Sequence, residues 1–319
     1  AGEVQSVRGV SFSVRKGETL AIVGESGCGK SVTAKSIMGL IQVPPGEIKE
    51  GSKILLKGKN LLEQSEKEWE SYRGAKCAMV FQDALTALNP TMRIGKQIAE
   101  NITNHQKAGK DEVKKRVLEM LRLVGIADAK GCVKKYPHEL SGGMRQRVMI
   151  ATALAGNPEI LIADEPTTAL DVTIQAQIMD LLVEIQQKLG MTVILITHDL
   201  GVVANSADRV VVMYSGKVVE TGTCTEIFEK HKHPYTWALL KAAPDMELGS
   251  KQKLVAIEGT PPDLILPPKG CPFAARCKYA MKLCQENLPQ LTEIGEGHRS
   301  ACWLHNPSVK AKRGEVKLS

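Results

Sequence analysis

Short apolar segments alternate with amphipathic segments along most of the chain. Apolar runs of strand length, rich in β-branched residues, occupy residues 18–24, 77–82, 159–163, 192–197 and 209–214. A continuous apolar run of this length is typical of a strand that is buried on both faces, as in a parallel sheet. Segments with the helical repeat lie between these runs, so the pattern predicts an α/β fold with a mainly parallel sheet.

Local signals predict where individual helices begin and end. A helix should run from residue 30 to about residue 40, and another should follow Asp171, which can cap it, and end at Gly190. One face of the second helix is apolar, and it comprises Ile174, Ile178, Leu181, Leu182, Ile185 and Leu189. Residues 85–155 are mostly helical by the same criteria, with a helix stop at Gly125, and we interpret them as an inserted helical subdomain.

Two further segments have strand character. Residues 53–61 are predicted to form a strand. Residues 209–214 and 217–220 are predicted to pair as a hairpin across Ser215-Gly216, which has the composition of a tight turn.

The region after residue 243 has a different character. Thr260-Pro261-Pro262-Asp263 and Pro267-Pro268 mark a stiff linker, and the segment that follows has few long apolar runs. We therefore divide the chain into a domain of residues 1–243 and a segment of residues 244–319 that holds the linker and a small C-terminal domain.

Composition limits the classes of protein to consider. Apolar residues make up 43% of the 319 residues, and no run of about 18 apolar residues is present to span a bilayer. A protein of this kind would have to dock onto other subunits to serve a membrane. The net charge of +7 is modest, and basic residues do not interleave with aromatic residues as a nucleic-acid surface requires. We therefore expect no nucleic-acid partner.

A glycine-rich loop connects the first predicted strand to the first predicted helix. It has the P-loop pattern, and its residues are Gly24, Glu25, Ser26, Gly27, Cys28, Gly29, Lys30 and Ser31, followed by Val32. Glycines let successive N–H groups point at phosphates, and the helix N-terminus adds its dipole. Lys30 should reach the β- and γ-phosphates, while the Ser31 hydroxyl should bind Mg²⁺.

Two carboxylates end the apolar strand at residues 159–163. Asp164 is placed to hold Mg²⁺, directly or through water, and Glu165 is placed to polarise an attacking water molecule. The simpler interpretation is a solvated acidic turn, but the buried strand before the pair favours catalysis.

A second anion-binding helix start lies more than 100 residues beyond the P-loop. Ser141, Gly142 and Gly143 open a helix that also contains Gln146, in the pattern LSGGxxQ. One loop already satisfies one set of phosphates, so this second site indicates a nucleotide bound to another protomer.

The P-loop, the LSGGxxQ element and the strand ending in Asp-Glu, in this order, resemble the ATP-binding-cassette (ABC) ATPase family. The resemblance implies hydrolysis of ATP with Mg²⁺, a P-loop ATPase domain whose mainly parallel sheet carries an antiparallel β subdomain, and a dimer in which the LSGGxxQ element completes the partner's ATP site. It also assigns His198 to the γ-phosphate, Gln82 to Mg²⁺ and to sensing of the transporter, and Asp171 to the dimer interface.

Family members stack adenine on an aromatic residue that precedes the P-loop. Only Phe12 is available here, in a segment that alternates like a core strand. We expect a truncated N-terminus, and the adenine contact is not assigned.

Several segments are similar to the oligopeptide/dipeptide importer branch of this family. They are residues 82–92, His233-Pro234-Tyr235-Thr236, residues 259–263, and the C-terminal stretch containing Gly270-Cys271-Pro272-Phe273, Arg276-Cys277, Cys284, His298 and Ala301-Cys302-Trp303. The resemblance implies a peripheral subunit at the cytoplasmic face of the plasma membrane that powers peptide uptake. Its expected partners are a second ATPase subunit (in a heterodimer, with a homodimer as the alternative), two membrane permease subunits and, indirectly, an extracellular binding protein.

Two alternative functions are an importer of nickel or another small substrate and a non-transport ABC ATPase. The presence of one P-loop and the lack of sustained heptads argue against the non-transport ATPase.

Four of the eight cysteines are clustered near the C-terminus, with the spacing C-x5-C-x6-C-x17-C. They are Cys271, Cys277, Cys284 and Cys302. Structural zinc sites more often have tighter C-x2–4-C pairs, so the spacing favours a [4Fe–4S] cluster over Zn²⁺, with disulfides or no site as further alternatives. The family resemblance also favours the cluster, which would stabilise a segment with a small core and leads us to expect a metal-stapled C-terminal domain.

Overall fold

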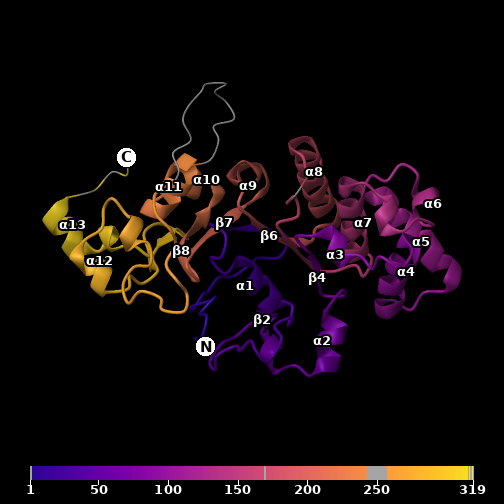
Figure 1. The fold of residues 1–319 in the computed structure, drawn as a ribbon, viewed down its shortest axis with the longest axis horizontal. Coiled ribbons are helices and arrows are strands. Elements are labelled where there is room, and N and C mark those ends of the chain that lie inside the picture. Colours follow the sequence, from indigo (N-terminus) through magenta and orange to yellow (C-terminus); the bar gives the residue numbers. More distant parts are fainter. Residues whose placement is uncertain (1, 169, 243–256, 315, 317, 319) are drawn as a thin grey trace. The chain divides into compact units, whose positions relative to one another are not determined.

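The structure is a computed structural model that describes residues 2–168, 170–242, 257–314, 316 and 318. The chain divides into two units, and Figure 1 labels their helices and strands. The P-loop unit comprises Ala1–Val14, Thr19–Thr33 and Thr197–Ser319, and the signature unit comprises Arg15–Glu18 and Ala34–Ile196. The predicted domain boundary at residue 243 falls in the segment 243–256, outside the described residues.

The P-loop unit contains parallel and antiparallel strand pairs. Its strands are β1 (Thr19–Val23), β7 (Arg209–Tyr214), β8 (Lys217–Thr223), β9 (Thr292–Glu293) and β10 (Arg299–Ser300). Strand β1 pairs with β7 in parallel, whereas β7 and β8 form an antiparallel hairpin across Ser215 and Gly216, whose φ angles are 48° and 74°. This confirms the predicted hairpin.

The C-terminal segment extends the sheet of the P-loop unit. Strand β10 pairs with β8, with Ser300 opposite Glu220, and β9 pairs with β10. Phe273 of the same segment is buried in one cluster with Val23 of β1 and Tyr214 of β7. The C-terminal segment therefore shares the core of this unit, which the sequence pattern did not predict.

Helices surround these strands. Those of the P-loop unit are α1 (Lys30–Ile37), which continues into the signature unit, α9 (Leu200–Ser206), α10 (Cys224–Glu229), α11 (Pro234–Ala242), η3 (Ala274–Arg276), α12 (Lys282–Glu286), η4 (Trp303–His305) and α13 (Pro307–Arg313). Helix α1 ends before residue 40, where the sequence pattern placed its end, because Gly39 adopts a left-handed φ of 62°.

The signature unit has a parallel set of three strands, β4 (Cys77–Val80), β5 (Ile160–Asp164) and β6 (Thr192–Thr197), in that order. Residues 53–61 do not form one strand, so that prediction was wrong. They form the antiparallel hairpin β2 (Leu55–Leu56) and β3 (Lys59–Asn60), because Lys57 and Gly58 both adopt left-handed φ angles, 51° and 83°, and reverse the chain.

Helices occupy most of residues 85–155, as predicted. The helices of the signature unit are η1 (Leu61–Glu63), α2 (Glu66–Tyr72), α3 (Ala84–Ala87), α4 (Ile94–His105), α5 (Lys110–Leu123), α6 (Ala129–Cys132), η2 (Pro137–Glu139), α7 (Gly142–Leu154) and α8 (Val172–Leu189). Figure 1 shows α4, α5, α6 and α7 grouped together. Helix α5 buries its apolar face and stops at Gly125 (φ 74°), as predicted.

Candidate nucleotide site and C-terminal cysteine segment

The P-loop connects β1 to α1. Lys30 is 4% exposed, and its Nζ donates to the carbonyl oxygens of Gly24 (2.7 Å) and Glu25 (3.1 Å). A Cβ at Gly24 would clash with the carbonyl oxygen of Met213 and lie 2.9 Å from Cys28 Sγ, so only glycine fits there. The lysine is therefore held against the loop that it is predicted to serve.

The other predicted nucleotide residues of this unit lie at the ends of elements. Ser31 and Val32 lie in the first turn of α1. His198 follows β6 and is exposed. The next residue, Asp199, caps α9 by accepting bonds from the N–H groups of Gly201 (2.9 Å) and Val202 (3.2 Å).

Three predicted residues of the signature unit converge at the end of β5. Asp164 is 4% exposed. Glu165 follows it with a left-handed φ of 46°, and its N–H donates to the Ile196 carbonyl (2.8 Å). Its carboxylate accepts hydrogen bonds from Gln82 Nε2 and from Thr168 Oγ1, both at 3.1 Å. A non-glycine residue with this φ is strained by about 1–3 kcal/mol, which is typical of functional sites.

The LSGGxxQ element opens α7. Ser141 caps the helix by accepting a bond from the Met144 N–H (3.4 Å). A Cβ on Gly143 would lie 2.8 Å from the Ile174 side chain, so this position has little room for a larger residue. Gln146 is 3% exposed, and its Nε2 has no hydrogen-bond partner among the described residues.

Asp171 caps α8 as predicted. Its Oδ1 accepts a bond from the Ile174 N–H at 3.0 Å, and α8 ends at Gly190 with φ 60°. The interface role of this loop stays a prediction, and Ala169 lies outside the described residues.

The four clustered cysteines line a single cavity. Cys271, Cys277, Cys284 and Cys302 share it with His233 and aromatic residues. None of the eight cysteines, all of which are described, forms a disulfide. Burial raises the pKa of Cys271 to about 11 and that of Cys302 to about 12, so these thiols are protonated at neutral pH.

In the part of the chain that the structure describes, no group of three or more His, Cys, Asp or Glu side chains is placed to hold a metal ion. The convergence of the four thiols on one cavity is a necessary condition for the predicted cluster, but the metal site and its stabilising role stay predictions.

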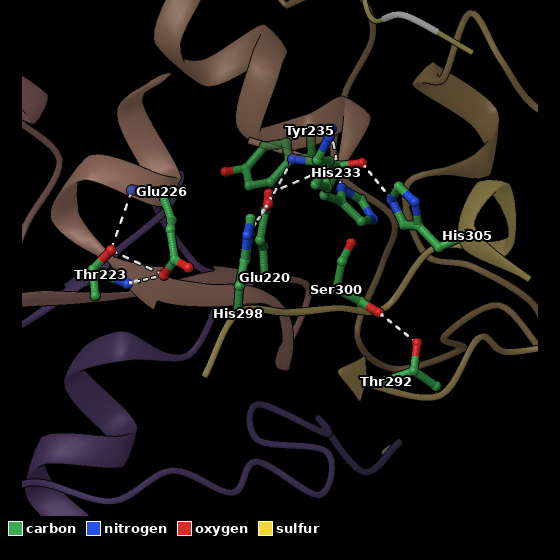
Figure 2. Close-up of polar contacts among 10 residues, drawn as sticks. Glu220, Thr223, Glu226, His233, Tyr235, Thr292, His298, Ser300 and His305 are labelled. Atoms are coloured by element: carbon green, nitrogen blue, oxygen red, sulfur yellow. Dashed lines mark hydrogen bonds and ion pairs between the residues drawn. The ribbon is translucent and has the colours of Figure 1, made fainter. Parts of the chain in front are cut away.

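The buried carboxylate of Glu220 on β8 contacts His298 of the C-terminal segment (Figure 2). Glu220 is 0% exposed, and its Oε1 lies 2.8 Å from His298 Nε2. It also accepts bonds from the N–H groups of Lys232 (2.6 Å) and His233 (3.0 Å). Burial alone would raise the pKa of Glu220, but hydrogen bonds, first of all from His298, lower it below its usual range.

His233 lies on the other side of this carboxylate and is 1% exposed (Figure 2). Its Nδ1 accepts a bond from the Tyr235 N–H at 3.0 Å. Burial lowers the pKa of His233 to about 4, although the negative charge of Glu220 partly opposes this shift.

We expect the folded chain to lose stability as the pH falls from about 6.5 to about 4. In this range the unfolded chain binds a proton at His233, whose ordinary pKa is 6.5, and the folded chain does not. The free energy of unfolding should therefore fall by about 1.4 kcal/mol per pH unit from this residue alone. Glu220 acts in the same direction below its ordinary pKa of 4.5, because its pKa in the folded state is lowered.

Chemical denaturation of the full chain at a series of pH values checks this expectation. His233→Asn, whose amide oxygen can still accept from the Tyr235 N–H, should flatten the profile. The matched control is His138→Asn at an exposed position. An unchanged slope in the His233 variant would contradict the assignment.

Sequence reasoning missed several residues that organise the P-loop unit. No role was predicted for Arg276, Glu220 or Tyr235, which are all buried or half-buried and contact groups distant in the sequence. The position of Arg276 directly before Cys277 was the one signal in the sequence that could have drawn attention to it. Nothing in the sequence predicts that Arg276 pairs with Glu25.

Comparison with known proteins identifies the family. A model described as "ABC transporter" matches residues 7–168, and one described as "Oligopeptide/dipeptide transporter, C-terminal region" matches residues 219–284. The oligopeptide transport ATP-binding protein OppD of Bacillus subtilis is 57% identical over 308 residues, covering 97% of this chain and 86% of that protein. This chain belongs to the family of oligopeptide/dipeptide ABC transporter ATP-binding subunits.

Other relatives agree with this assignment. The dipeptide transport ATP-binding protein DppD is 55% identical in Bacillus subtilis (96% of this chain and 90% of that protein) and 48% identical in Escherichia coli (97% and 93%). Among solved structures, a dimeric ATP-binding cassette in a post-hydrolysis state with ADP and Pi matches with a TM-score of 0.61 and 28% identity, covering 69% of this chain and 90% of that one. CbiO1 of Clostridium perfringens, part of the ABC transporter complex cbiONQ, matches with a TM-score of 0.60 and 34% identity, covering 70% and 85%.

The comparisons show a P-loop ABC ATPase with a mostly parallel α/β fold. Among the residues that the structure describes, no helix combines the length and apolar character needed to cross a membrane.

Proposed function

We propose that this chain is the ATP-hydrolysing motor of an importer of dipeptides or oligopeptides. The observation that carries the proposal is that the peptide-transporter relatives match both the P-loop unit and the C-terminal segment, at 57% identity over 97% of the chain. ATP hydrolysis in one subunit then drives transport through separate membrane subunits.

The P-loop binds the phosphates of ATP. Gly24, Glu25, Ser26, Gly27, Cys28, Gly29, Lys30, Ser31 and Val32 contribute backbone N–H groups and, at Lys30, a positive charge. The carbonyl oxygens of Gly24 and Glu25 hold the ammonium group in the structure. When ATP binds, phosphate oxygens replace these neutral acceptors. The hydrogen bonds of the Lys30 ammonium group then become stronger, because bonds between charged groups are stronger.

The residues at the end of β5 serve the hydrolysis step. Asp164, Gln82 and Ser31 bind Mg²⁺, which neutralises charge on the transferred phosphoryl group. Glu165 polarises the attacking water, and His198 contacts the γ-phosphate. The bonds from Gln82 and Thr168 to Glu165 support this assignment, since they fix the carboxylate that must align the water.

The LSGGxxQ element acts on the ATP of a partner subunit. Ser141, Gly142, Gly143 and Gln146 contact that nucleotide, and the loop before Asp171 lies at the dimer interface. The start of α7 supports this role, because it places two glycines, Gly142 and Gly143, in the first turn of a helix, where anions bind. We infer a heterodimer with a second ATPase subunit, with a homodimer as the alternative.

The remaining partners follow from the function. Two permease subunits span the membrane, an extracellular binding protein delivers the substrate, and this chain is peripheral at the cytoplasmic face of the plasma membrane. Nucleic acid is not a partner.

Purification of the tagged chain from detergent-solubilised membranes tests this assembly. Two permease subunits and a second ATPase should co-purify, and vesicles containing the complex should take up dipeptides in an ATP-dependent manner. Uptake of nickel rather than peptide would instead assign the chain to a small-substrate importer. Recovery with ribosomes or DNA and without permeases would exclude a transport function.

We also propose that Cys271, Cys277, Cys284 and Cys302 hold a [4Fe–4S] cluster, with Zn²⁺ as the alternative. The support is that all four free thiols line one cavity. When bound, the group supplies four strong bonds that stabilise a segment with a small core.

A further inference from the structure

The phosphate-binding loop contains a single carboxylate, Glu25, and a distant arginine pairs with it. Arg276 Nη1 lies 2.6 Å from Glu25 Oε2, and Arg276 Nη2 lies 2.9 Å from Glu25 Oε1. The Arg276 side chain is 4% exposed and that of Glu25 is 25% exposed. This is a two-point, largely desolvated ion pair, which is stronger and more directional than a surface salt bridge.

The guanidinium group has no spare hydrogen-bonding capacity. It has five N–H donors. Besides the two bonds to Glu25, Nη1 donates to Tyr214 Oη (3.1 Å), Nη2 to the Ile257 carbonyl (3.1 Å), and Nε to the Glu258 carbonyl (2.9 Å). The bonds to Ile257 and Glu258 hold the guanidinium group against the C-terminal segment, in addition to its bonds to the P-loop and to β7.

Aromatic residues enclose the same group. The Arg276 guanidinium carbon lies 5.8 Å from the ring centre of Tyr214 and 5.9 Å from that of Phe273. Tyr235 packs against both rings, with centroid distances of 4.5 Å and 5.3 Å. This packing removes water from one side of the ion pair and reduces screening of its charges.

Glu25 is held at three points, and each holds a different part of it. Its carboxylate is bound by Arg276, its N–H donates to Tyr235 Oη at 2.8 Å, and its carbonyl accepts from Lys30 Nζ at 3.1 Å. A change in the Glu25 side chain is therefore transmitted to the backbone that faces the phosphates and to the lysine that binds them.

The charge of Glu25 matters for nucleotide binding. A triphosphate carries several negative charges, and an unpaired carboxylate in the loop that binds it would repel it. We propose that Arg276 is a positioning residue of the nucleotide site, which neutralises Glu25 and holds its carboxylate away from the phosphates. The C-terminal cysteine segment thereby sets the ATP affinity of the P-loop. The inference rests on the proposed role of the P-loop in ATP binding.

Equilibrium binding of MgATP to the full chain tests the proposal without requiring partners or hydrolysis. Arg276→Gln should weaken binding about tenfold or more, because it leaves a charged and poorly hydrated Glu25 beside the phosphates. Glu25→Gln should weaken binding less than Arg276→Gln does, since the amide removes the repelling charge and keeps an oxygen that can accept from Arg276. The double variant should bind nearly as well as Glu25→Gln, and added salt should reduce the defect of Arg276→Gln by screening the repulsion.

Three further variants make the result specific. Arg276→Lys keeps the charge and should bind ATP more tightly than Arg276→Gln. Arg73→Gln is a matched control, because Arg73 also pairs with a carboxylate, Glu66 (2.9 Å), and donates to the carbonyls of Met38 and Gly39. It should leave ATP affinity unchanged. Lys30→Ala should abolish binding if the P-loop is the nucleotide site.

The outcomes distinguish failure of the proposal for Arg276 from failure of the P-loop assignment. Wild-type affinity in Arg276→Gln would overturn the proposal, and so would equal losses in Arg276→Gln and Glu25→Gln that the double variant does not restore, because that pattern indicates only structural support. Normal binding by Lys30→Ala would instead overturn the assignment of the P-loop on which the proposal rests.

Discussion

Glu165→Gln is expected to reduce ATP turnover by about 10²- to 10⁴-fold while leaving ATP binding within about threefold of the wild-type affinity. The amide has the size of the carboxylate, and its oxygen can still accept the bonds from Gln82 and Thr168. It lacks the negative charge that we propose polarises the attacking water, so the defect should lie in the chemical step. Phosphate release by the transporter assembled with its partner subunits, together with ATP binding, measures the two quantities separately.

The choice of control decides how this result is interpreted. Glu184 lies on α8 and is exposed, so Glu184→Gln changes the same functional group outside the site and should keep normal turnover. Wild-type turnover in Glu165→Gln would remove Glu165 from the mechanism. Loss of ATP binding as well would mean that the strained backbone at φ 46°, rather than the charge, is what the glutamate maintains.

If the four cavity cysteines hold the proposed metal, loss of a single one should remove it. The chain purified without oxygen should be brown and contain roughly four irons and four sulfides, and Cys302→Ser should be nearly free of both, because a serine hydroxyl is a poor replacement for a thiolate ligand. Visible absorption with iron, sulfide and zinc analysis measures this. The raised pKa values of Cys271 and Cys302 imply that loading releases protons and weakens as the pH falls.

Cys224 provides the matched control for this experiment. It is a free, partly exposed cysteine in the same unit, and it does not line the cavity. Cys224→Ser should therefore keep a full complement of metal. Colourless protein with about one zinc per chain would replace the cluster with a structural zinc site, and metal-free protein would overturn both versions of the proposal.

The residue that contacts the P-loop and a residue that lines the cysteine cavity lie on one short turn. Helix η3 ends at Arg276, and Cys277 follows immediately, so adjacent residues face the Glu25 carboxylate and the cysteine cavity. Metal loss that displaces Cys277 would therefore disturb the contact of Arg276 with the P-loop. ATP binding measured on loaded and metal-free chain would show this connection as a difference in affinity.

Local signals in the sequence were sufficient for features that depend on a few neighbouring residues. The P-loop, the cap of α8 by Asp171, its stop at Gly190 and the turn at Ser215-Gly216 all follow from backbone freedom at glycine and from short-range hydrogen bonds. The order of strands and helices follows from the apolar period in the same way. These features are confirmed because burial and turn chemistry act within a few residues.

The hairpin of β2 and β3 was not predicted from the local sequence pattern. Leu55 and Asn60 face each other across a turn that contains Lys57, a residue without special turn propensity, so the apolar pattern alone suggested one strand. Lys57 adopts a positive φ angle beside Gly58 although lysine has no preference for it, so the residue type at position 57 did not indicate the chain reversal.

By itself, the sequence determined the family chemistry of this protein: a phosphate loop, a strand ending in Asp164 and Glu165, and a helix start suited to a second nucleotide. Only the tertiary structure decided that the C-terminal segment pairs with β8 and places Arg276 against Glu25, which lies 251 residues away. The physical reason is that a charge pair and a strand pairing depend on which surfaces meet after folding. No pattern in either segment alone encodes that meeting.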